Sequence, residues 1–467
     1  MVRVDPPRLL TLDQLSRIRE AAIRVLREHG LRVLSPAALQ AAAEAGLAVA
    51  DGRLLFDRPM IETALPQPTA PPQPQQTRIL PPAQLELTTC QYATYLHDLE
   101  TDTVVPFTEA RVVEAAKLVD VLSEEGVVGG APGCPCDVPP LLQPVVQYKI
   151  QAECCRHGRV PVDAKWVRTM PYVMEMAEVL GHPIRHLPVY MISPLTLGGE
   201  SLDAAMAFRD RLDAVHVANM SSVGASAPVL LFDALALGLA EVIGGTLAVQ
   251  ALTGLPASWS VAAVPFDLRG GAMSYGGPEH LLFRWACHEV KAAFRGLEPW
   301  SNYGVIRTQA KLPGAQAAAD KMAGLVSGAL LGSCSFDGVG ALSLEEVFSA
   351  EQAIVDCELR DYVQRLIGGI DGERGVAAAT AEIAEGIYDG YLTLDSTLSR
   401  YRETYWLPKL WERRPLSGWI GAGAPDPRKR AKALAREKVK QHCYELPAEL
   451  RRPLERIHQR AQQDLAT

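Results

Sequence analysis

The feature that most constrains this chain is a regular alternation, from Thr108 onward, of helix-like segments with short apolar runs that end in glycine, serine or proline. Such alternation is typical of parallel strands that are each followed by a helix. It predicts an α/β fold of the TIM (β/α)8 barrel type, with a doubly wound open sheet as the structural alternative. Seven strands are predicted, at Val127 to Gly130, Val160 to Ala164, Pro188 to Ser193, Ala214 to Met220, Ala257 to Val264, Trp300 to Ile306 and Ser333 to Val339.

The regions around this array differ from it in pattern. A helical period with a possible Thr11 N-cap opens the chain, and a segment rich in proline and glutamine follows from Pro66 to Pro82. Two β-prone runs between Leu85 and Val105 predict a hairpin, which is one source for an eighth strand; the segment around residue 370 is another. We therefore expect an N-terminal helical extension at 1–66, a linker and β-hairpin at 67–107, a TIM barrel core at 108–375 and a C-terminal helical region or tail at 376–467.

Composition and charge exclude several classes of protein. A formal net charge of −8 disfavours nucleic acid as a partner, and the basic stretch Arg428 to Lys440 is interpreted as a solvated helix face. The most apolar long segment, Leu235 to Leu255, contains Glu241 and predicts a helix buried in protein instead of a membrane span. Nine scattered cysteines, an odd number, and the absence of a signal-peptide pattern in Met1 to Leu10 predict free thiols and a cytoplasmic location.

Signals for bound nucleotides and metals are weak. The glycine pairs form neither a G-x-G-x-x-G turn nor a P-loop with its lysine. Cys134 and Cys136 have C-x-C spacing without a matching second pair, although Cys154, Cys155 and His157 follow. Free thiols are the favoured interpretation, and no metal site is predicted.

Several motifs then occur in a colinear order. They are Ser193-Pro194-Leu195, Gly224-Ala225-Ser226-Ala227-Pro228, Phe266-Asp267-Leu268-Arg269-Gly270-Gly271, Gly277-Pro278-Glu279 and Val355-Asp356-Cys357-Glu358-Leu359. In this order they resemble the trimethylamine methyltransferase family, which includes glycine betaine methyltransferases, over about Leu10 to Pro415. The resemblance implies a TIM barrel that moves a methyl group from a methylated amine to the Co(I) of a corrinoid (cobalamin). That corrinoid is carried by a separate protein, so this chain is expected to bind none permanently.

The chain departs from the family in two places. It contains no pyrrolysine, the residue that defines the trimethylamine-specific enzymes, and it has Asp395-Ser396-Thr397-Leu398 where many relatives carry a His-Thr-Leu motif. A quaternary ammonium loses a methyl group as a neutral tertiary amine and needs no proton, whereas a tertiary amine must first become cationic. The departures therefore favour a quaternary amine such as a betaine-like, carnitine-like or choline-like compound, and most closely the glycine betaine branch.

Aromatic and cationic residues at predicted strand ends are the candidate substrate ligands. A quaternary ammonium binds to aromatic faces, and Trp259, Phe266, Tyr303 and Phe336 lie within or just after predicted strands. Each of them has packing in the barrel as its alternative. A substrate carboxylate would be met by a guanidinium, for which the candidates are Arg269 and Arg307, with surface ion pairs as the alternative.

Polar residues complete the predicted site. Asp267, Asp337 and Glu346 are the candidate catalytic carboxylates, although Ser343 and Glu346 also fit a helix-capping box. Glu241 and His216 are interpreted as structural. The residues expected to orient the substrate are Asn302, Gln309 and Gln316.

Two alternatives to methyl transfer remain open at this point. A TIM-barrel lyase or hydrolase would use Asp267, Asp337 and Glu346 as acid and base. A non-catalytic quaternary-amine-binding barrel is the second alternative, motivated by the missing histidine motif. In all cases a homo-oligomer is expected, with the N-terminal helices and the C-terminal tail as plausible contact surfaces.

Overall fold

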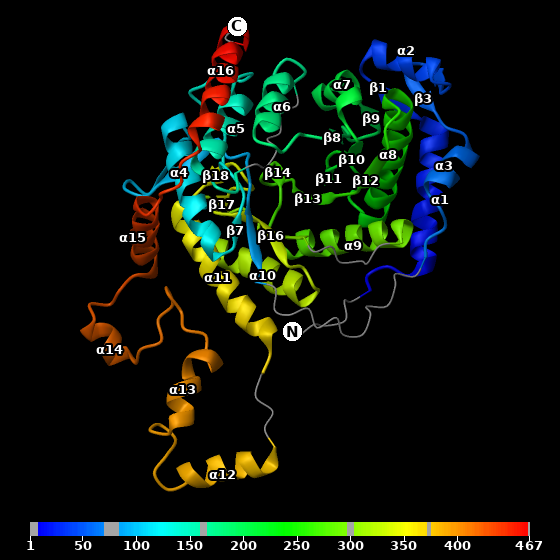
Figure 1. Ribbon diagram of the computed structural model, residues 1–467. Helices are drawn as coiled ribbons and strands as arrows, with labels where there is room; N and C mark the ends of the chain where they lie inside the picture. The colour runs from blue at the N-terminus through cyan, green and yellow to red at the C-terminus, as the bar shows by residue number, and fades with distance from the viewer. Residues whose placement is uncertain (1–7, 70–83, 159–165, 297–302, 371–374, 466–467) are drawn as a thin grey trace.

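Parallel strands occupy the centre of the molecule, and helices surround them (Figure 1). The computed structural model describes residues 8–69, 84–158, 166–296, 303–370 and 375–465. The predicted strand at Val160 to Ala164 therefore lies entirely outside the described residues, and so do the first three residues of the strand predicted at Trp300 to Ile306. The prediction of an α/β fold with parallel strands is confirmed.

The central strands form two parallel arcs. One arc has the order β15-β16-β4-β7 and the other the order β12-β10-β8. Their bounds are β4 Glu86–Thr89, β7 Val127–Val128, β8 His186–Tyr190, β10 Ala214–Ala218, β12 Ala257–Ser260, β15 Tyr303–Val305 and β16 Ser335–Val339. The last of these strands in the chain, β16, pairs in parallel with the first, β4. Within the described residues no strand pairing joins the two arcs.

The additional strand, β4, comes from the segment expected to be a linker and hairpin. It lies at the start of the segment Leu85 to Val105, which is predicted to form a hairpin and is one expected source of an eighth strand. The hairpin itself is confirmed further along this segment as the antiparallel pair β5 (Tyr95–Asp98) and β6 (Thr103–Pro106). The other strands of this region pair in small separate ladders: β9 Thr196–Leu197, β11 Ser221–Val223, β13 Ala263–Asp267, β14 Ala272–Met273, β17 Ala341–Leu342 and β18 Val347–Phe348.

Eight helices follow the strands and surround them in Figure 1. They are α4 Glu109–Leu122, α5 Gln143–Cys154, α6 Met170–Val179, α7 Glu200–Ala207, α8 Leu231–Thr253, α9 Pro278–Arg295, α10 Ala315–Leu330 and α11 Ala350–Gly368. The two sides of each strand differ in polarity, as β10 shows. Val215 and Val217 are buried in the core shared with α8, whereas His216 lies on the other side, beside Ser258 and Ser260.

Helix α8 is the most apolar long helix of the described residues. By length and composition it could cross a membrane, but 78% of its apolar window is buried inside the structure. It packs against α1 (Leu12–His29), where an added Cβ at Gly244 would lie 2.7 Å from Leu26 Cδ1, so this glycine permits the close helix contact. The buried position agrees with the prediction of a helix enclosed in protein.

The N-terminal extension is attached to the strands through α1 and a small sheet. Thr11 caps α1 as predicted, because its side chain accepts a hydrogen bond from Gln14 N. The strand β1 pairs in parallel with β9, next to the loop that follows β8. The other elements of the extension are β1 Leu31–Val33, α2 Pro36–Glu44, β2 Ala48–Ala50, β3 Arg53–Leu55 and α3 Arg58–Ala64.

The C-terminal helices divide into a packed pair and a protruding set. Helix α15 packs on α11 and α4, and α16 packs on α5 and α6, whereas α12 and α13 extend away from the body (Figure 1). The basic stretch is therefore not a wholly solvated face, because Ala431 and Ala435 of α15 are buried. The bounds are α12 Val376–Gly386, α13 Asp395–Thr404, α14 Leu416–Gly421, α15 Pro427–Lys440 and α16 Ala448–Leu465.

Candidate active site

Three charged side chains meet at the carboxyl ends of β15 and β16, the end at which barrel enzymes place their active sites. Arg307 Nη2 lies 2.7 Å from Asp337 Oδ2, and the same guanidinium forms an ion pair with Glu345. The three side chains retain 19%, 9% and 17% of their exposure, respectively. With both carboxyl groups ionised, this cluster carries one negative charge in excess.

The backbone around the cluster explains why these side chains meet. Ile306 N donates to Asp337 O at 2.8 Å, which continues the β15–β16 pairing up to Arg307. Ser343 and Leu344 then have φ values of 49° and 67°, in the left-handed region that reverses the chain direction. Leu344 N donates to Thr308 O at 2.9 Å, and this contact places the next residue, Glu345, beside Arg307.

A fully buried ion pair supports the strand that carries Asp337. Lys321 Nζ donates to Asp356 Oδ2 at 2.7 Å and to Gly338 O at 2.9 Å, and both side chains are 0% exposed. Asp356 Oδ2 also accepts a hydrogen bond from Gly340 N at 2.7 Å. The pair therefore fixes the backbone on the carboxyl side of Asp337, and so the position of the carboxylate that faces Arg307.

Tyr275 forms the aromatic side of the cluster. The Arg307 guanidinium carbon lies 5.5 Å from the centroid of its ring, and the His280 ring lies 4.8 Å from it on another side. The Tyr275 hydroxyl donates to Met220 Sδ at 3.2 Å, which links the segment after β14 to the segment after β10. Burial lowers the pKa of His280 to about 3, so this imidazole is neutral at pH 7.

Apart from Glu345 Oε1, which forms the ion pair with Arg307, two buried polar atoms at the site have no hydrogen-bond partner among the described residues. They are Arg307 Nε, a donor, and Gln309 Oε1, an acceptor. Burial also raises the pKa of Glu345, against the opposing effect of Arg307. Unpaired buried polar atoms are unfavourable unless a ligand or water pairs with them. A bound cation would offset the excess negative charge, so the cluster has the electrostatics of a cation site.

The structure pairs two of the predicted site residues, Arg307 and Asp337, and a third, Gln309, follows Arg307 by two positions in the chain. The Gln309 amide donates to Met273 O on the strand that precedes Tyr275. Two members of the cluster, Glu345 and Tyr275, were not predicted. Sequence signals for them are slight: Glu345 stands next to the predicted Glu346, and Tyr275 immediately precedes a Gly-Gly-Pro-Glu motif.

The predicted residues on the β13–β14 hairpin lie apart from the cluster contacts. Arg269 pairs with Asp267 through two hydrogen bonds of 3.1 Å, and 91% of the Arg269 side chain is exposed. This ion pair lowers the pKa of Asp267. Phe266 is half-buried in β13, opposite Met273. Asp267 therefore orders the loop that carries Arg269.

Two predicted aromatic residues pack on the helix side of their strands. Trp259 is buried in the core with α8, and its ring lies 5.9 Å from the guanidinium carbon of Arg295. Phe336 is 0% exposed and lies against Gly328 of α10. Neither lies on the polar side of the sheet, because alternate residues of a strand face opposite sides. Packing, the alternative stated for each, is what the structure shows.

The remaining predicted residues either lie outside the cluster or have side chains that are not among those described. Asn302 is not among the described residues, and for Tyr303 only the backbone in β15 is described. Gln316 is exposed at the start of α10, and Glu346 is exposed with Oε2 accepting from Ser343 Oγ at 2.7 Å. The capping-box alternative for Glu346 is wrong, because the N-cap of the next helix, α11, is Ser349.

Glu241 is structural, as interpreted, and its partners lie at the carboxyl ends of the other arc. Its carboxylate accepts hydrogen bonds from Ser193 Oγ at 2.8 Å, Asn219 Nδ2 at 2.8 Å and Leu195 N at 3.0 Å. Burial raises its pKa despite these donors. Asn219 also accepts from Ala262 N at 3.0 Å, so this one carboxylate fixes the loops that follow β8, β10 and β12.

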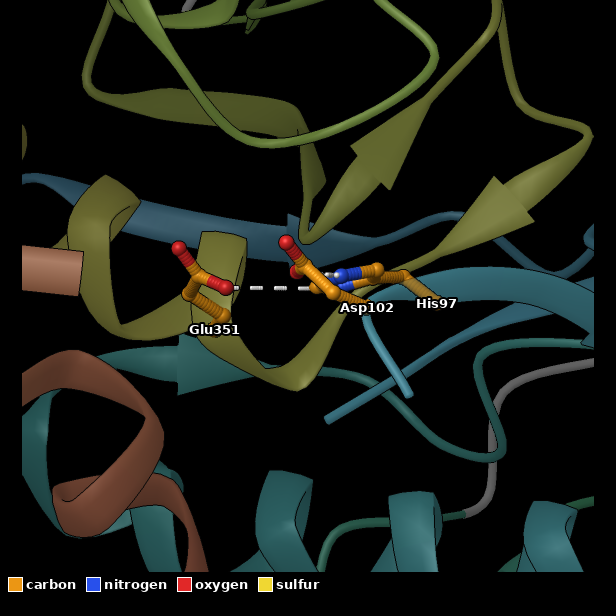
Figure 2. A group of neighbouring side chains, drawn as sticks. All are labelled: His97, Asp102 and Glu351. Carbon is orange, nitrogen blue, oxygen red and sulfur yellow. Dashed lines mark hydrogen bonds and ion pairs between the residues drawn. The ribbon is translucent and has the colours of Figure 1, made fainter. Parts of the chain in front are cut away.

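A separate group, His97, Asp102 and Glu351, has the spacing of metal ligands (Figure 2). His97 Nε2 lies 2.8 Å from Asp102 Oδ1 and its Nδ1 lies 4.0 Å from Glu351 Oε2. Arg428 and Lys432 of α15 each donate to Asp102 at 2.7 Å, and Arg428 Nε donates to Glu351 at 2.6 Å. These cations already neutralise both carboxylates, so the group anchors α15 and does not fit a metal.

Several known proteins are similar to this chain in sequence or structure. A trimethylamine methyltransferase of Methanosarcina mazei is 31% identical over 228 residues, which cover 48% of this chain and 44% of that protein. A glycine betaine methyltransferase of Desulfitobacterium hafniense is 24% identical over 434 residues, 88% of each chain. The crystal structure of a Methanosarcina barkeri monomethylamine methyltransferase, 11% identical, superposes with a TM-score of 0.46 over 92% of this chain and 87% of that one. The profile of the trimethylamine methyltransferase (MTTB) family matches residues 2–464, and this chain therefore belongs to that family.

Proposed function

We propose that this protein transfers a methyl group from a quaternary amine, glycine betaine or a close analogue, to the corrinoid of a separate protein. Family membership over residues 2–464 and similarity to a glycine betaine methyltransferase along 88% of both chains support a methyltransferase of this class. The similarity to the trimethylamine enzyme extends over 44% of that protein, and the chain lacks pyrrolysine. A quaternary substrate is therefore the better proposal.

The single observation that carries this proposal is the cluster of Arg307, Asp337 and Glu345 beside Tyr275. Its excess negative charge and its aromatic ring are the two features that bind a methylated ammonium group. Among the described residues, the donor Arg307 Nε and the acceptor Gln309 Oε1 also have no hydrogen-bond partner. Arg307 Nε suits the carboxylate of a betaine, while Glu345 lies beside it to balance the ammonium charge.

The residues of the cluster then act by positioning and electrostatics. Glu345 and Tyr275 hold the cation, Asp337 holds Arg307, and Lys321 and Asp356 hold the strand that carries Asp337. No residue has to supply a proton, because the amine leaves as a neutral molecule. When bound, the partner's Co(I) supplies the nucleophile that accepts the methyl group. Fixed geometry and exclusion of water are what this chain contributes.

The proposal includes closure of the two strand arcs into one TIM barrel. Closure is supported by the parallel pairing of the last central strand, β16, with the first, β4. In a doubly wound sheet, crossover connections build outward from a switch point, whereas in a barrel the first and last strands are neighbours. We also place the protein in the cytoplasm, since all nine cysteines are free in the structure.

The lyase or hydrolase alternative receives less support. It needs Asp267, Asp337 and Glu346 to act as acid and base. Asp267 is paired with Arg269 on an exposed hairpin, and Asp337 is held by Arg307. Glu346 is exposed and bonded to Ser343.

The test is a panel of glycine betaine, carnitine, choline, proline betaine and trimethylamine, each mixed with the protein and free cob(I)alamin. Loss of the Co(I) absorbance with one quaternary amine, and none with trimethylamine, would support the proposal. Turnover without any corrinoid would contradict it, as would transfer from trimethylamine alone. If free cobalamin is inert, the panel is repeated with a corrinoid protein captured by pull-down, and no transfer there either would also overturn the proposal.

A further inference from the structure

The segment 375–404, here called the arm, exposes apolar side chains that soluble proteins normally bury. It contains α12 and α13, in which the only buried residue is Gly386. Exposed fractions reach 92% for Tyr388, 83% for Leu392 and 69% for Leu398. Contiguous exposed apolar surface of this kind marks interaction sites. Figure 1 shows the arm projecting away from the strands and their helices.

The base of the arm is fixed to the body. Arg365 of α11 donates to Gly369 O at 2.7 Å on the outgoing side and to Thr404 O at 2.6 Å on the returning side. Just beyond, the buried carboxylate of Glu358 accepts hydrogen bonds from the backbone N–H groups of residues 409, 410 and 411. The arm therefore begins and ends at defined positions, and its exposed side chains are presented by anchored helices.

The charge of the arm is opposite to that of exposed cations on the last two helices, α15 and α16. Arm residues 375–404 include five acidic residues, Glu382, Glu385, Asp389, Asp395 and Glu403, against two basic ones, Arg400 and Arg402. Helices α15 and α16 present exposed cations that have no ion-pair partner among the described residues: Lys429, Arg430, Lys440, Arg452 and Arg456. Both surfaces belong to every copy of the chain.

We propose that the arm of one chain docks on the α15–α16 surface of a second copy, so that the two chains exchange arms. Apolar burial of residues such as Tyr388 and Leu392 drives the association, and the acidic arm is oriented by the basic helices. Each copy carries both surfaces, so two copies related by a two-fold axis can each dock an arm on the other. Two-fold symmetry is the commonest symmetry of soluble oligomers. A separate partner protein would have to supply its own basic surface, whereas a second copy already has one.

The first test is the mass in solution of the full-length protein, measured by light scattering at several concentrations. We expect the natural chain to form a dimer or a larger even-numbered assembly. The double variant Tyr388→Ser/Leu392→Ser should dissociate with an apparent Kd at least about tenfold higher, since two apolar side chains lose their burial. The matched control, Leu12→Ser/Val49→Ser, alters two apolar side chains of the N-terminal extension, the other expected contact surface, that are 46% and 37% exposed. It should leave the mass unchanged, and a lower mass in this variant alone would assign the contact to the N-terminal extension and overturn the proposal.

A charge exchange separates a specific contact from general stickiness. Glu385→Lys/Asp389→Lys should weaken the assembly, and Arg452→Glu/Arg456→Glu should do the same. Combining all four substitutions in one chain should restore it, because the signs are complementary again. Circular dichroism establishes that each variant is folded. A natural chain that stays monomeric at tens of micromolar would overturn the proposal, as would an arm variant that keeps its mass or binding of the arm to a corrinoid protein instead.

Discussion

Arg307 Nη2 and Asp337 Oδ2 lie 2.7 Å apart although 30 residues separate them in the chain. The same guanidinium also holds Glu345, so a single cation serves two carboxylates in a setting with little exposure to water. This arrangement gives the site a net negative charge when both carboxyl groups are ionised. It makes a cationic substrate the natural ligand, and it makes the cluster sensitive to any change that alters the balance of charge.

Replacing Arg307 is expected to remove most activity. In Arg307→Lys a single ammonium cannot bind two carboxylates in the geometry of a guanidinium. The loss of a buried charge partner typically costs about 2–5 kcal/mol, so kcat/KM for glycine betaine should fall by about 30-fold or more. Arg269→Lys is the matched control, because that side chain is 91% exposed and should change kcat/KM by less than about twofold. Equal losses in both variants would remove Arg307 from its assigned position.

The neighbouring carboxylates Glu345 and Glu346 should differ in their contribution to substrate binding. Glu345→Gln removes the excess negative charge beside Arg307 and should raise KM for a quaternary amine by about tenfold, the value of a single desolvated charge interaction of 1.4 kcal/mol. Glu346→Gln alters an exposed side chain and should leave KM nearly unchanged. Steady-state kinetics of the two variants decide between Glu345 and the residue predicted from the sequence.

The pH dependence of kcat/KM should reflect the ionisation of Glu345. Burial raises the pKa of Glu345, so kcat/KM should rise with pH through a value above the ordinary 4.3 or so of a glutamate. Over the same interval the free energy of unfolding contributed by this group falls, since the unfolded chain loses the proton first. Measured pH profiles should therefore lose their acidic limb in Glu345→Gln. A limb that persists in the variant would assign it to another group.

The buried pair Lys321 and Asp356 should behave as a unit. Lys321→Met leaves a carboxylate uncompensated at 0% exposure and should lower the free energy of unfolding by about 3–5 kcal/mol. In the double variant Lys321→Met/Asp356→Leu the loss should be smaller than the sum of the two single losses by at least about 1 kcal/mol. Denaturant titration of the four proteins gives this coupling energy, and strict additivity would show that the pair does not act through its contact.

The group His97, Asp102 and Glu351 should not respond to metals. Lys432, His97 and Arg428 hold the pKa of Asp102 well below its usual range, and the two cations of α15 use the oxygens that a metal would need. Chelator, zinc or manganese should leave the Tm unchanged. In contrast, Arg428→Met should loosen α15, seen as faster amide hydrogen exchange in residues 427–440. A Tm that rises with a divalent metal would show that the carboxylates are available to it.

Much of the fold was predictable from the sequence. A strand buries every second residue and a helix buries residues three or four apart, so the local spacing of apolar residues indicates which element forms. The parallel strands, the hairpin at β5 and β6, the Thr11 cap and the burial of α8 all follow from such patterns. The pairing of β4 does not follow from such a pattern. Nothing in the local sequence of its four residues indicates that they pair with β16 and β7.

The sequence by itself determined the family, the alternation of strands and helices and the chemistry expected of the chain, since these depend on motifs and on local periodicity. Only the tertiary structure decided which side chains meet. Trp259 and Phe336 lie on the helix side because a strand turns alternate residues to opposite faces, and apolar residues suit either face. Glu345 reaches Arg307, and its neighbour Glu346 does not, because a left-handed turn at Ser343 and Leu344 sets the direction of the chain. A contact between residues far apart in the chain depends on packing around both, and no local pattern records it.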